Sequence, residues 1–471
     1  MSQQSLFQGV KRIVAVGALF CSTALSAQAD NLTDALIGAY KTSGLLEQQR
    51  AVLRAADEDV AIALAQLRPV VNWVTSFTQT FRDTEINSVN TSTDSSTLFT
   101  GIRLQQLLYD GGASRLSQES AQETVLATRQ VLLSVEQQIL LRAVSAYAGV
   151  LLQQENLALR QNNLRLLQEE LRATQDRFEV GEVTRTDVAL AESRVAAAQA
   201  NLTDARGDLI DARAEYVNAV GNDPGTVAEQ PQLPARPSSL PAARSVAAQN
   251  HPNILADQHG VRAAELDLEA AGKSLGPNAT FQIDLGLSNQ YSGPNTYTED
   301  LSAQITLTQP VYAGGALNAT IRKVQAARDA SRSVLLTTQR DIAQGVSNAF
   351  VALEVARANI VSTAEQVRAA QVAFDGIREE ASLGARTTLD VLQAEQDLLD
   401  AKTAQLNAAA AQIVASYALV SSQGLLTAER LGLAVQIYDP TLYYNLVKDA
   451  PARTSKQSED LNRVLEALGK Y

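Results

Sequence analysis

Residues 180–192 read VGEVTRTDVALAE, and residues 383–395 read LGARTTLDVLQAE. The two stretches lie 203 positions apart, and the same offset aligns residues 108–112 (LYDGG) with residues 311–315 (VYAGG). A repeat of this length is far longer than the roughly 20–50 residues of a solenoid unit. The sequence therefore predicts two structurally equivalent halves, each with the same order of elements.

The N-terminus has the pattern of a secretory signal peptide over residues 1–29. Lys11 and Arg12 precede a short apolar stretch and a small-residue cleavage pattern. The alternative for Cys21 is attachment of a lipid, which the bulky residue in front of it disfavours. We therefore expect an exported chain that begins near Asp30 and has no cysteine.

The charge of the exported chain is acidic. The first 29 residues hold two basic and no acidic side chains, so the remainder has 37 Lys and Arg against 51 Asp and Glu, a net charge of −14. Nucleic-acid-binding proteins need a basic surface, so we expect no nucleic-acid partner. No stretch after the signal approaches the roughly 20 apolar residues of a transmembrane helix.

Side chains that carry catalysis are scarce. His251 and His259 are eight residues apart, which is too far for an i,i+4 pair of metal ligands on a helix. No phosphate-binding loop or nucleophile motif stands out. We therefore expect no enzyme, no cofactor and no metal site.

Proline marks the boundaries of the predicted helices. None occurs at residues 70–223 or 311–439, whereas five of the twelve lie within residues 224–241. Proline is costly inside a helix, so each proline-free region can hold two long helices around a glycine turn. The four predicted helices span about 113–177, 186–219, 316–381 and 388–422. Apolar residues recur along them every seven positions, as at Leu392, Leu399 and Leu406, which favours coiled-coil packing.

Before each pair of long helices, the apolar period changes to two. The four predicted strands span about 70–82, 97–108, 279–291 and 300–309. One apolar and one polar face suit a transmembrane barrel, although a soluble half-buried sheet has the same alternation. Four aromatic residues near the strand ends resemble a membrane-interface girdle: Phe81, Phe99, Tyr291 and Tyr297. The loops at about 82–96 and 292–298 would then be extracellular.

A transmembrane sheet must close into a barrel, and this sets the number of strands that it needs. The smallest membrane barrels have about eight strands, and an open sheet edge cannot face lipid. If the four strands are transmembrane, several chains must contribute to one barrel.

The predicted organisation is α+β, mainly α, with duplicated hairpin–long-helix–turn–helix halves. The segments are a first repeat at 30–222, a proline-rich linker at 223–245, a second repeat at 246–424 and a C-terminal segment at 425–471. Four glycines would turn the chain from strand to helix: Gly111, Gly112, Gly314 and Gly315.

This duplicated order behind a signal peptide resembles the TolC family of bacterial outer-membrane efflux and secretion channels. The resemblance runs from about residue 31 to 444. It rests on both Tyr-x-Gly-Gly hairpin ends, both glycine turns and a Leu-Gly-Leu…Tyr-Asp-Pro segment at 431–440. It implies a homotrimer in the outer membrane of a Gram-negative bacterium, with a 12-stranded barrel on a 12-helix periplasmic tunnel. The linker and C-terminal segments would form an equatorial belt.

The resemblance also implies partners and a gate. A periplasmic adaptor and an inner-membrane transporter would dock at the tunnel tip, so the chain would be the passive exit duct of a tripartite efflux pump or a type I secretion system. The docking turns would be Val180, Gly181, Leu383 and Gly384. The alternative is that these turns only reverse the chain.

Three residues match family positions that tie neighbouring helix pairs shut: Thr186, Asp187 and Arg386. The alternative is ordinary solvation of the tip, and Ala381 stands where the type member has a latch tyrosine. Asp390 matches a position that forms a carboxylate ring favouring cations. It could equally be a helix N-terminal carboxylate. Gln393 replaces a second ring aspartate, an absence that Asp187 would offset.

The sequence also allows a protein of a different class. A periplasmic coiled-coil scaffold or adaptor outside the membrane would explain the seven-residue rows. It would not explain two hairpins with alternating faces.

Overall fold

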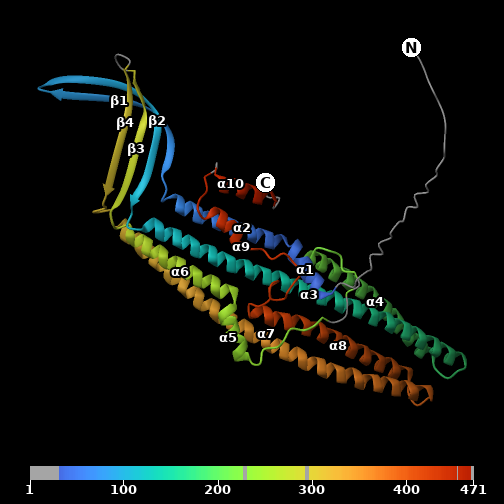
Figure 1. Cartoon of the computed structure of the whole chain (residues 1–471). Coiled ribbons are helices and arrows are strands. Elements are labelled where there is room, and N and C mark those ends of the chain that lie inside the picture. Colours follow the sequence, from blue (N-terminus) through green and yellow to red (C-terminus); the bar gives the residue numbers. More distant parts are fainter. Residues whose placement is uncertain (1–30, 226, 228–230, 292–295, 453–454, 468–471) are drawn as a thin grey trace, which may run out of the picture.

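Figure 1 shows a computed structural model of the chain, in which a rod of helices carries a β-sheet at one end. The structure describes residues 31–225, 227, 231–291, 296–452 and 455–467. The predicted signal peptide and its cleavage site lie outside these residues. Within the described residues, no helix is both long enough and apolar enough to span a membrane.

The two halves repeat one order of elements. The first half holds α1 (Leu32–Thr42), α2 (Gly44–Ala65), β1 (Val70–Ile86), β2 (Val89–Tyr109), α3 (Ala113–Glu179) and α4 (Arg185–Val220). The second half holds α5 (Leu240–Asn250), α6 (Pro252–Lys273), β3 (Asn278–Gln290), β4 (Thr296–Thr308), α7 (Ala316–Ser382) and α8 (Thr388–Ser422). Two further helices follow, α9 (Pro440–Val447) and α10 (Lys456–Ala467). Each half is thus helix, helix, hairpin, long helix, long helix.

The long helices begin and end within two residues of the sequence expectation. The short helices α1, α2, α5 and α6 were not predicted, although their caps are visible in the sequence. Asn31 and Asp34 form a capping box at α1, and Ser43 caps α2. Helix α5 begins at Leu240, capped by Ser239, so the linker predicted to run to residue 245 ends earlier. Proline at the start of α5 is compatible with the helix because the first turn has no backbone hydrogen bond to lose.

The four strands form one antiparallel sheet in the order β1-β2-β3-β4. Residues that pair across the sheet share a face. One row across the apolar face consists of Trp73, Ile102, Leu285 and Leu301. The next row, on the opposite face, consists of Asn72, Arg103, Asp284 and Ser302. The sheet therefore has one apolar face and one polar face, and its outer strands β1 and β4 each have a free edge.

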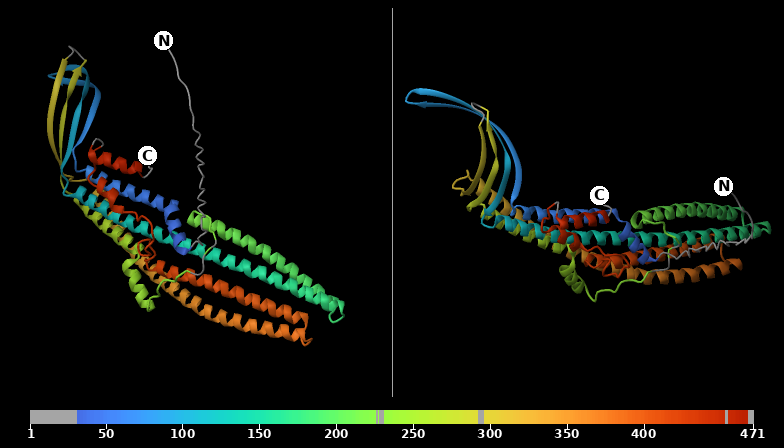
Figure 2. Two further views of the ribbon diagram at one scale, coloured as in Figure 1. Left: turned by 45° about the vertical axis from the view of Figure 1, so that its right-hand side comes forward. Right: turned by 45° about the horizontal axis from the view of Figure 1, so that its top comes forward.

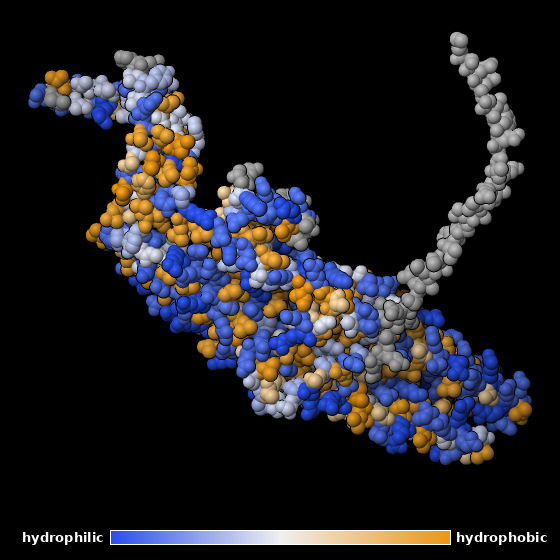
Figure 3. Space-filling model, viewed as in Figure 1, coloured by the Kyte–Doolittle hydropathy of each residue, from blue (hydrophilic) through white to orange (hydrophobic). Residues whose placement is uncertain are grey.

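The polar face is held by side chains that bond across β2 and β3. Arg103 Nε donates to Asp284 Oδ1 at 2.6 Å, and Gln105 Nε2 donates to Gln282 Oε1 at 3.0 Å. On the apolar face the large side chains are exposed in the single chain. Figure 3 shows hydrophobic residues gathered on the part of the sheet nearest the helices, with a mostly polar far end.

The first hairpin is longer than predicted. Pairing of β1 with β2 continues to Ile86 and Val89, so the prediction of a loop at 82–96 is wrong. Asn87 and Ser88, with φ of 53° and 63°, make the turn. Positive φ at two central residues is typical of a tight hairpin turn, for which asparagine is well suited. Because β3 ends at Gln290, the far part of this hairpin projects as a two-stranded ribbon (Figure 2).

Phe99 is also placed differently from the prediction. It pairs with Ser76 and Ser288 on the polar face, opposite the face that carries Phe81. Its ring lies over Gly286, where an added Cβ would meet the ring at 2.7 Å. Phe99 therefore covers a glycine in the sheet instead of joining an aromatic girdle.

The largest core lies where α1, α2, α3, α4 and the C-terminal segment meet. Tyr147, Leu140 and Leu53 are fully buried there. The C-terminal segment binds this core by polar contacts too, since Tyr443 Oη donates to Glu58 at 2.7 Å. Figure 1 shows α9 and α10 alongside α2, part-way along the rod.

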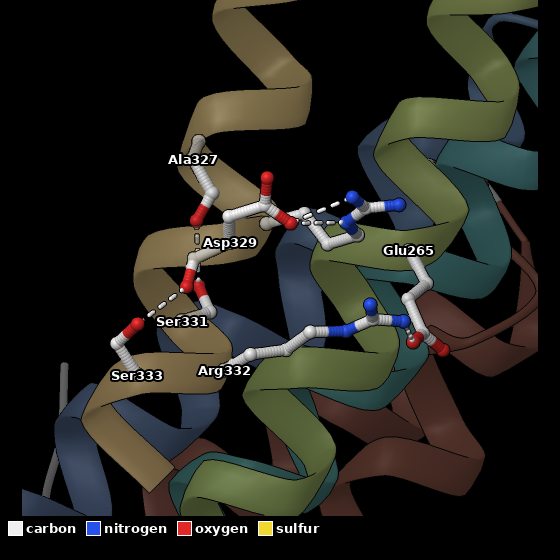
Figure 4. A network of polar contacts seen from close by, with 7 residues as sticks. Glu265, Ala327, Asp329, Ser331, Arg332 and Ser333 are labelled. Carbon is white, nitrogen blue, oxygen red and sulfur yellow. Dashed lines mark hydrogen bonds and ion pairs between the residues drawn. The ribbon is translucent and has the colours of Figure 1, made fainter. Parts of the chain in front are cut away.

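An ion pair joins α6 to α7, because Arg332 on α7 donates to Glu265 on α6 at 2.5 Å (Figure 4). Within α6, Arg262 also approaches Glu265 at 3.7 Å. Hydrogen bonding to Arg332 lowers the pKa of Glu265. Several large apolar side chains elsewhere on α7 are exposed, among them Val334, Val351 and Val372. In the single chain, α7 therefore presents an apolar surface that is not covered by any element among the described residues.

Candidate gate at the helix tips

The two glycine turns lie together at the end of the rod farthest from the sheet (Figures 1 and 2). Gly181 and Gly384 have φ of 82° and 79°, a left-handed conformation that glycine adopts without a steric cost. Gly181 N donates to Phe178 O at 3.0 Å, and Glu182 N donates to Arg177 O at 2.9 Å. This pattern closes the last turn of α3 and reverses the chain. The α7–α8 turn repeats it.

Each turn exposes one large apolar side chain next to its glycine. Val180 is 72% exposed and Leu383 is 78% exposed. Both directly follow the last residue of a long helix. The tip therefore presents two large apolar side chains to solvent in the single chain.

Capping boxes begin both returning helices. Asp187 Oδ2 accepts from Thr184 N at 2.9 Å and from Thr184 Oγ1 at 2.7 Å. Asp390 Oδ2 accepts from Thr387 N at 3.0 Å and from Thr387 Oγ1 at 2.8 Å. These hydrogen bonds lower the pKa of both carboxyls. Both side chains therefore carry charge at neutral pH.

Within the described part of one chain, Arg386 is not paired with Thr186 or Asp187, the other two residues predicted to form the latch. Arg386 Nε donates to Glu380 Oε2 at 2.7 Å, a hydrogen bond that raises the pKa of the guanidinium. The carboxylate of Asp187 accepts hydrogen bonds from Thr184 in the cap of α4, and Thr186 is exposed. Glu380 was missed from the sequence. Its pairing with Arg386 depends on the turn conformation, which brings together residues six positions apart.

Asp390 heads a polar stripe along α8. Gln393, Asp397 and Asp400 follow at spacings that keep them on one side of a helix. Gln393 Nε2 donates to Asp397 at 2.9 Å, and all three are exposed. Glutamine at 393 thus leaves a gap in an acidic stripe that continues past it.

The strand-to-helix glycines are where the sequence places them. Gly111, Gly112, Gly314 and Gly315 all have positive φ. In the first half, Asp110 accepts from Gly112 N at 2.9 Å and from Ser114 N at 2.7 Å. Ala313 replaces this aspartate in the second half, so only the first of the two turns has an acidic cap.

Each of the two histidines has a hydrogen-bond partner within the chain. His251 Nδ1 accepts from Asn253 N at 3.2 Å, and burial lowers the pKa of His251. His259 lies 2.7 Å from Glu123, joining α6 to α3. Across the described part of the chain, no group of three His, Cys, Asp or Glu is placed to hold a metal ion.

Comparisons with known proteins match this architecture along most of the chain. The profile of the family described as outer membrane efflux protein matches residues 39–222 and 243–425, one match for each half. Outer membrane efflux protein BepC from Brucella suis biovar 1 (strain 1330) is 36% identical over 454 residues, 94% of this chain and 97% of that protein. Outer membrane protein TolC from Escherichia coli (strain K12) is 25% identical over 167 residues, covering 33% of this chain and 34% of TolC.

Solved structures share the fold. A membrane protein from Pseudomonas aeruginosa superposes with a TM-score of 0.75 at 19% identity, covering 86% of this chain and 92% of the other. The CmeC outer membrane channel from Campylobacter jejuni superposes with a TM-score of 0.74 at 14% identity, covering 88% and 89%. At such low sequence identities, structural similarity shows only that the fold is shared. The family profile and the Brucella relative show that this chain belongs to the outer membrane efflux protein family.

Proposed function

We propose that this protein is the outer-membrane exit duct of an efflux pump, a passive channel that performs no catalysis. The observation that carries the proposal is the sheet with one apolar and one polar face, continuous with helices long enough to reach far from the membrane. At 1.5 Å per residue, the 67 residues of α3 span on the order of 100 Å. The same architecture could serve a type I secretion system.

The working unit of this proposal is a homotrimer. The free edges of β1 and β4 need partners in lipid, and three chains of four strands would make a 12-stranded barrel. The polar face, with Arg103 and Asp284, would line the lumen. The exposed apolar side chains of α7 would pack on the next chain in a 12-helix tunnel.

The belt in this proposal is formed by the linker and the C-terminal segment. Both bind the long helices. In the linker, Gln232 O accepts from Tyr417 Oη of α8 at 3.1 Å, and Arg236 pairs with Glu354 of α7 at 2.7 Å. In the C-terminal segment, Ala428 N donates to Glu136 Oε1 of α3 at 2.6 Å. These contacts support an equatorial position for both segments.

The gate in this proposal closes between chains. Arg386 of one protomer would reach Thr186 and Asp187 of the next, in exchange for or in addition to Glu380. A guanidinium has five N–H donors, so it can bind two carboxylates. Exposed ion pairs contribute only about 0–1 kcal/mol each. A docking protein can therefore open such a gate.

Docking and selectivity also involve the tip. A periplasmic adaptor, acting with an inner-membrane transporter, would contact Val180-Gly181 and Leu383-Gly384, because the side chains of Val180 and Leu383 are apolar and exposed. Asp390 would form a threefold carboxylate ring that favours cations. The stripe through Asp397 and Asp400 would extend that preference along α8.

Cysteine cross-linking tests the gate and the trimer together. The one cysteine of the sequence, Cys21, lies in the predicted signal peptide, so introduced cysteines stand alone in the exported chain. Thr186→Cys with Arg386→Cys is expected to give oxidised trimers on non-reducing gels. Thr203→Cys with Arg386→Cys, with one cysteine far along α4, is the matched control. Monomers from both pairs would count against the interchain gate.

Membrane extraction distinguishes the duct from a periplasmic scaffold. A barrel is expected to stay in the outer-membrane fraction after washing with high salt and to be released by detergent. Release by salt alone would favour the scaffold.

A further inference from the structure

A buried polar pair joins the two helical hairpins close to the tip. Glu395, in the second turn of α8, is 5% exposed. Asn163 Nδ2, on α3, donates to Glu395 Oε1 at 2.6 Å. This hydrogen bond connects residues 232 positions apart, one from each half of the chain. It lies about 10 Å along α8 from the first residue of that helix.

The surroundings of this pair are apolar on two sides. Leu392, one turn before Glu395, packs with Leu167 of α3 and Val195 of α4. Leu398, one turn after it, packs with Phe374 of α7. Glu395 is therefore a carboxyl set into the apolar seam between the α3–α4 and α7–α8 hairpins.

Charged groups near Glu395 come from two of the helices packed around it. Glu170 of α3 raises its pKa, and Arg194 of α4 lowers it. From α7, Phe374 and Ile377 belong to the same apolar cluster as Leu398, and among the described residues no charged group of α7 affects the pKa of Glu395. Burial is the largest influence and, against the hydrogen bond from Asn163, it raises the pKa of Glu395 to about 7.

We propose that the Asn163–Glu395 pair is a tie within one chain that holds the α7–α8 hairpin on the α3–α4 hairpin, and that proton uptake by Glu395 strengthens it. The inference rests on the proposed function, because it assigns a second control element to the gate. It differs from the interchain latch in its residues, in its location inside the seam and in its response to pH.

The sign of the pH dependence follows from burial. Separating the hairpins would expose the carboxyl to water, where its pKa returns toward 4.5. The packed state therefore binds the proton more tightly than the separated state. Between about pH 4.5 and 7, the packed state loses its advantage as the pH rises. Across that window the packed-to-separated ratio changes by at most about 300-fold per chain.

The test is single-channel conductance of the purified, full-length channel in planar bilayers at pH 5.5 and pH 8. The wild type is expected to conduct more, or open more often, at pH 8. Glu395→Gln keeps a hydrogen-bond acceptor but cannot ionise, so its conductance is expected to be low and equal at both pH values. The exchanged pair Asn163→Asp with Glu395→Gln restores a carboxylate and an amide and is expected to restore the pH dependence.

Asp57→Asn is the matched control, because burial also raises the pKa of Asp57 to about 7, but on α2 and outside the seam. It is expected to keep the pH dependence of conductance. A wild-type response in Glu395→Gln, or loss of the response in Asp57→Asn, would overturn the tie.

A second variant keeps the inference testable if the substitutions disturb packing. Asn163→Cys with Glu395→Cys is expected to form a disulfide within one chain that holds conductance low until reductant is added. An oxidised, cross-linked channel that conducts as well as the reduced one would refute the tie. If no variant and no wild type conducts, the proposed channel function has failed and the tie falls with it. If Arg386→Ala raises conductance but these variants do nothing, only the tie has failed.

Discussion

Asp57→Asn should stabilise the protein at alkaline pH and leave it unchanged at acid pH. Asp57, on α2, is fully buried, and neither carboxylate oxygen has a hydrogen-bond partner among the described residues. Burial is the main cause that raises its pKa from 3.8 to about 7, against an opposing effect of Arg129. The folded protein therefore binds the proton of Asp57 more tightly than the unfolded chain does.

The magnitude follows from the pKa difference. A group whose pKa is higher when folded contributes stability below the unfolded value, here 3.8, and loses it as the pH rises through the folded value, about 7. One pKa unit corresponds to about 1.4 kcal/mol, so the loss between pH 4 and pH 8 is at most about 4 kcal/mol. Asparagine has nearly the same shape and does not ionise, so it should avoid this loss.

Thermal unfolding of the detergent-solubilised protein measures the effect. The difference between Asp57→Asn and wild type is expected to be near zero at pH 4 and to grow toward pH 8 in favour of the variant. Glu192→Gln, an exposed change on α4, is the control and should show no such trend. A difference that stays constant with pH would refute the burial argument.

Three other predictions follow from packing and exposure. Gly101→Val should prevent folding of the sheet, because an added Cβ would meet Leu285 O at 2.4 Å, and the heat-resistant form of the protein should then be missing from gels. Thr100→Val is the control. A normal heat-resistant band for Gly101→Val would contradict the pairing register. Tyr147→Ala should lower the free energy of unfolding by about 3–5 kcal/mol, because Tyr147 is fully buried; a loss below about 1 kcal/mol would argue against this core. Leu383→Asp should abolish drug efflux in cells without changing conductance, and unchanged efflux would exclude Leu383 from docking.

Much of the fold could be predicted because the strongest signals are local. Long proline-free stretches and glycine turns locate the four long helices, and the 203-residue offset shows the duplication. The strands are visible where one face is apolar. The far part of the first hairpin, near Thr84 and Thr91, is polar on both faces, so alternation gives no signal there.

The errors have different physical causes. Phe99 is four positions before Arg103, so the period of two already places it on the polar face, and the prediction used only its position near a strand end. Arg386 and Glu380 meet because of the turn between them. The seam pair Asn163 and Glu395 depends on how two hairpins from different halves pack, which no local pattern specifies.

The central claim is that this chain forms a gated outer-membrane channel. The most direct measurement is single-channel conductance of the purified protein in a planar bilayer, comparing wild type with Arg386→Ala, with Arg378→Ala on α7 as the control. We expect a stable, small wild-type conductance that rises in Arg386→Ala and stays the same in Arg378→Ala. Equal conductance in all three would remove Arg386 from the gate. Correctly folded protein that neither inserts nor conducts would contradict the channel itself.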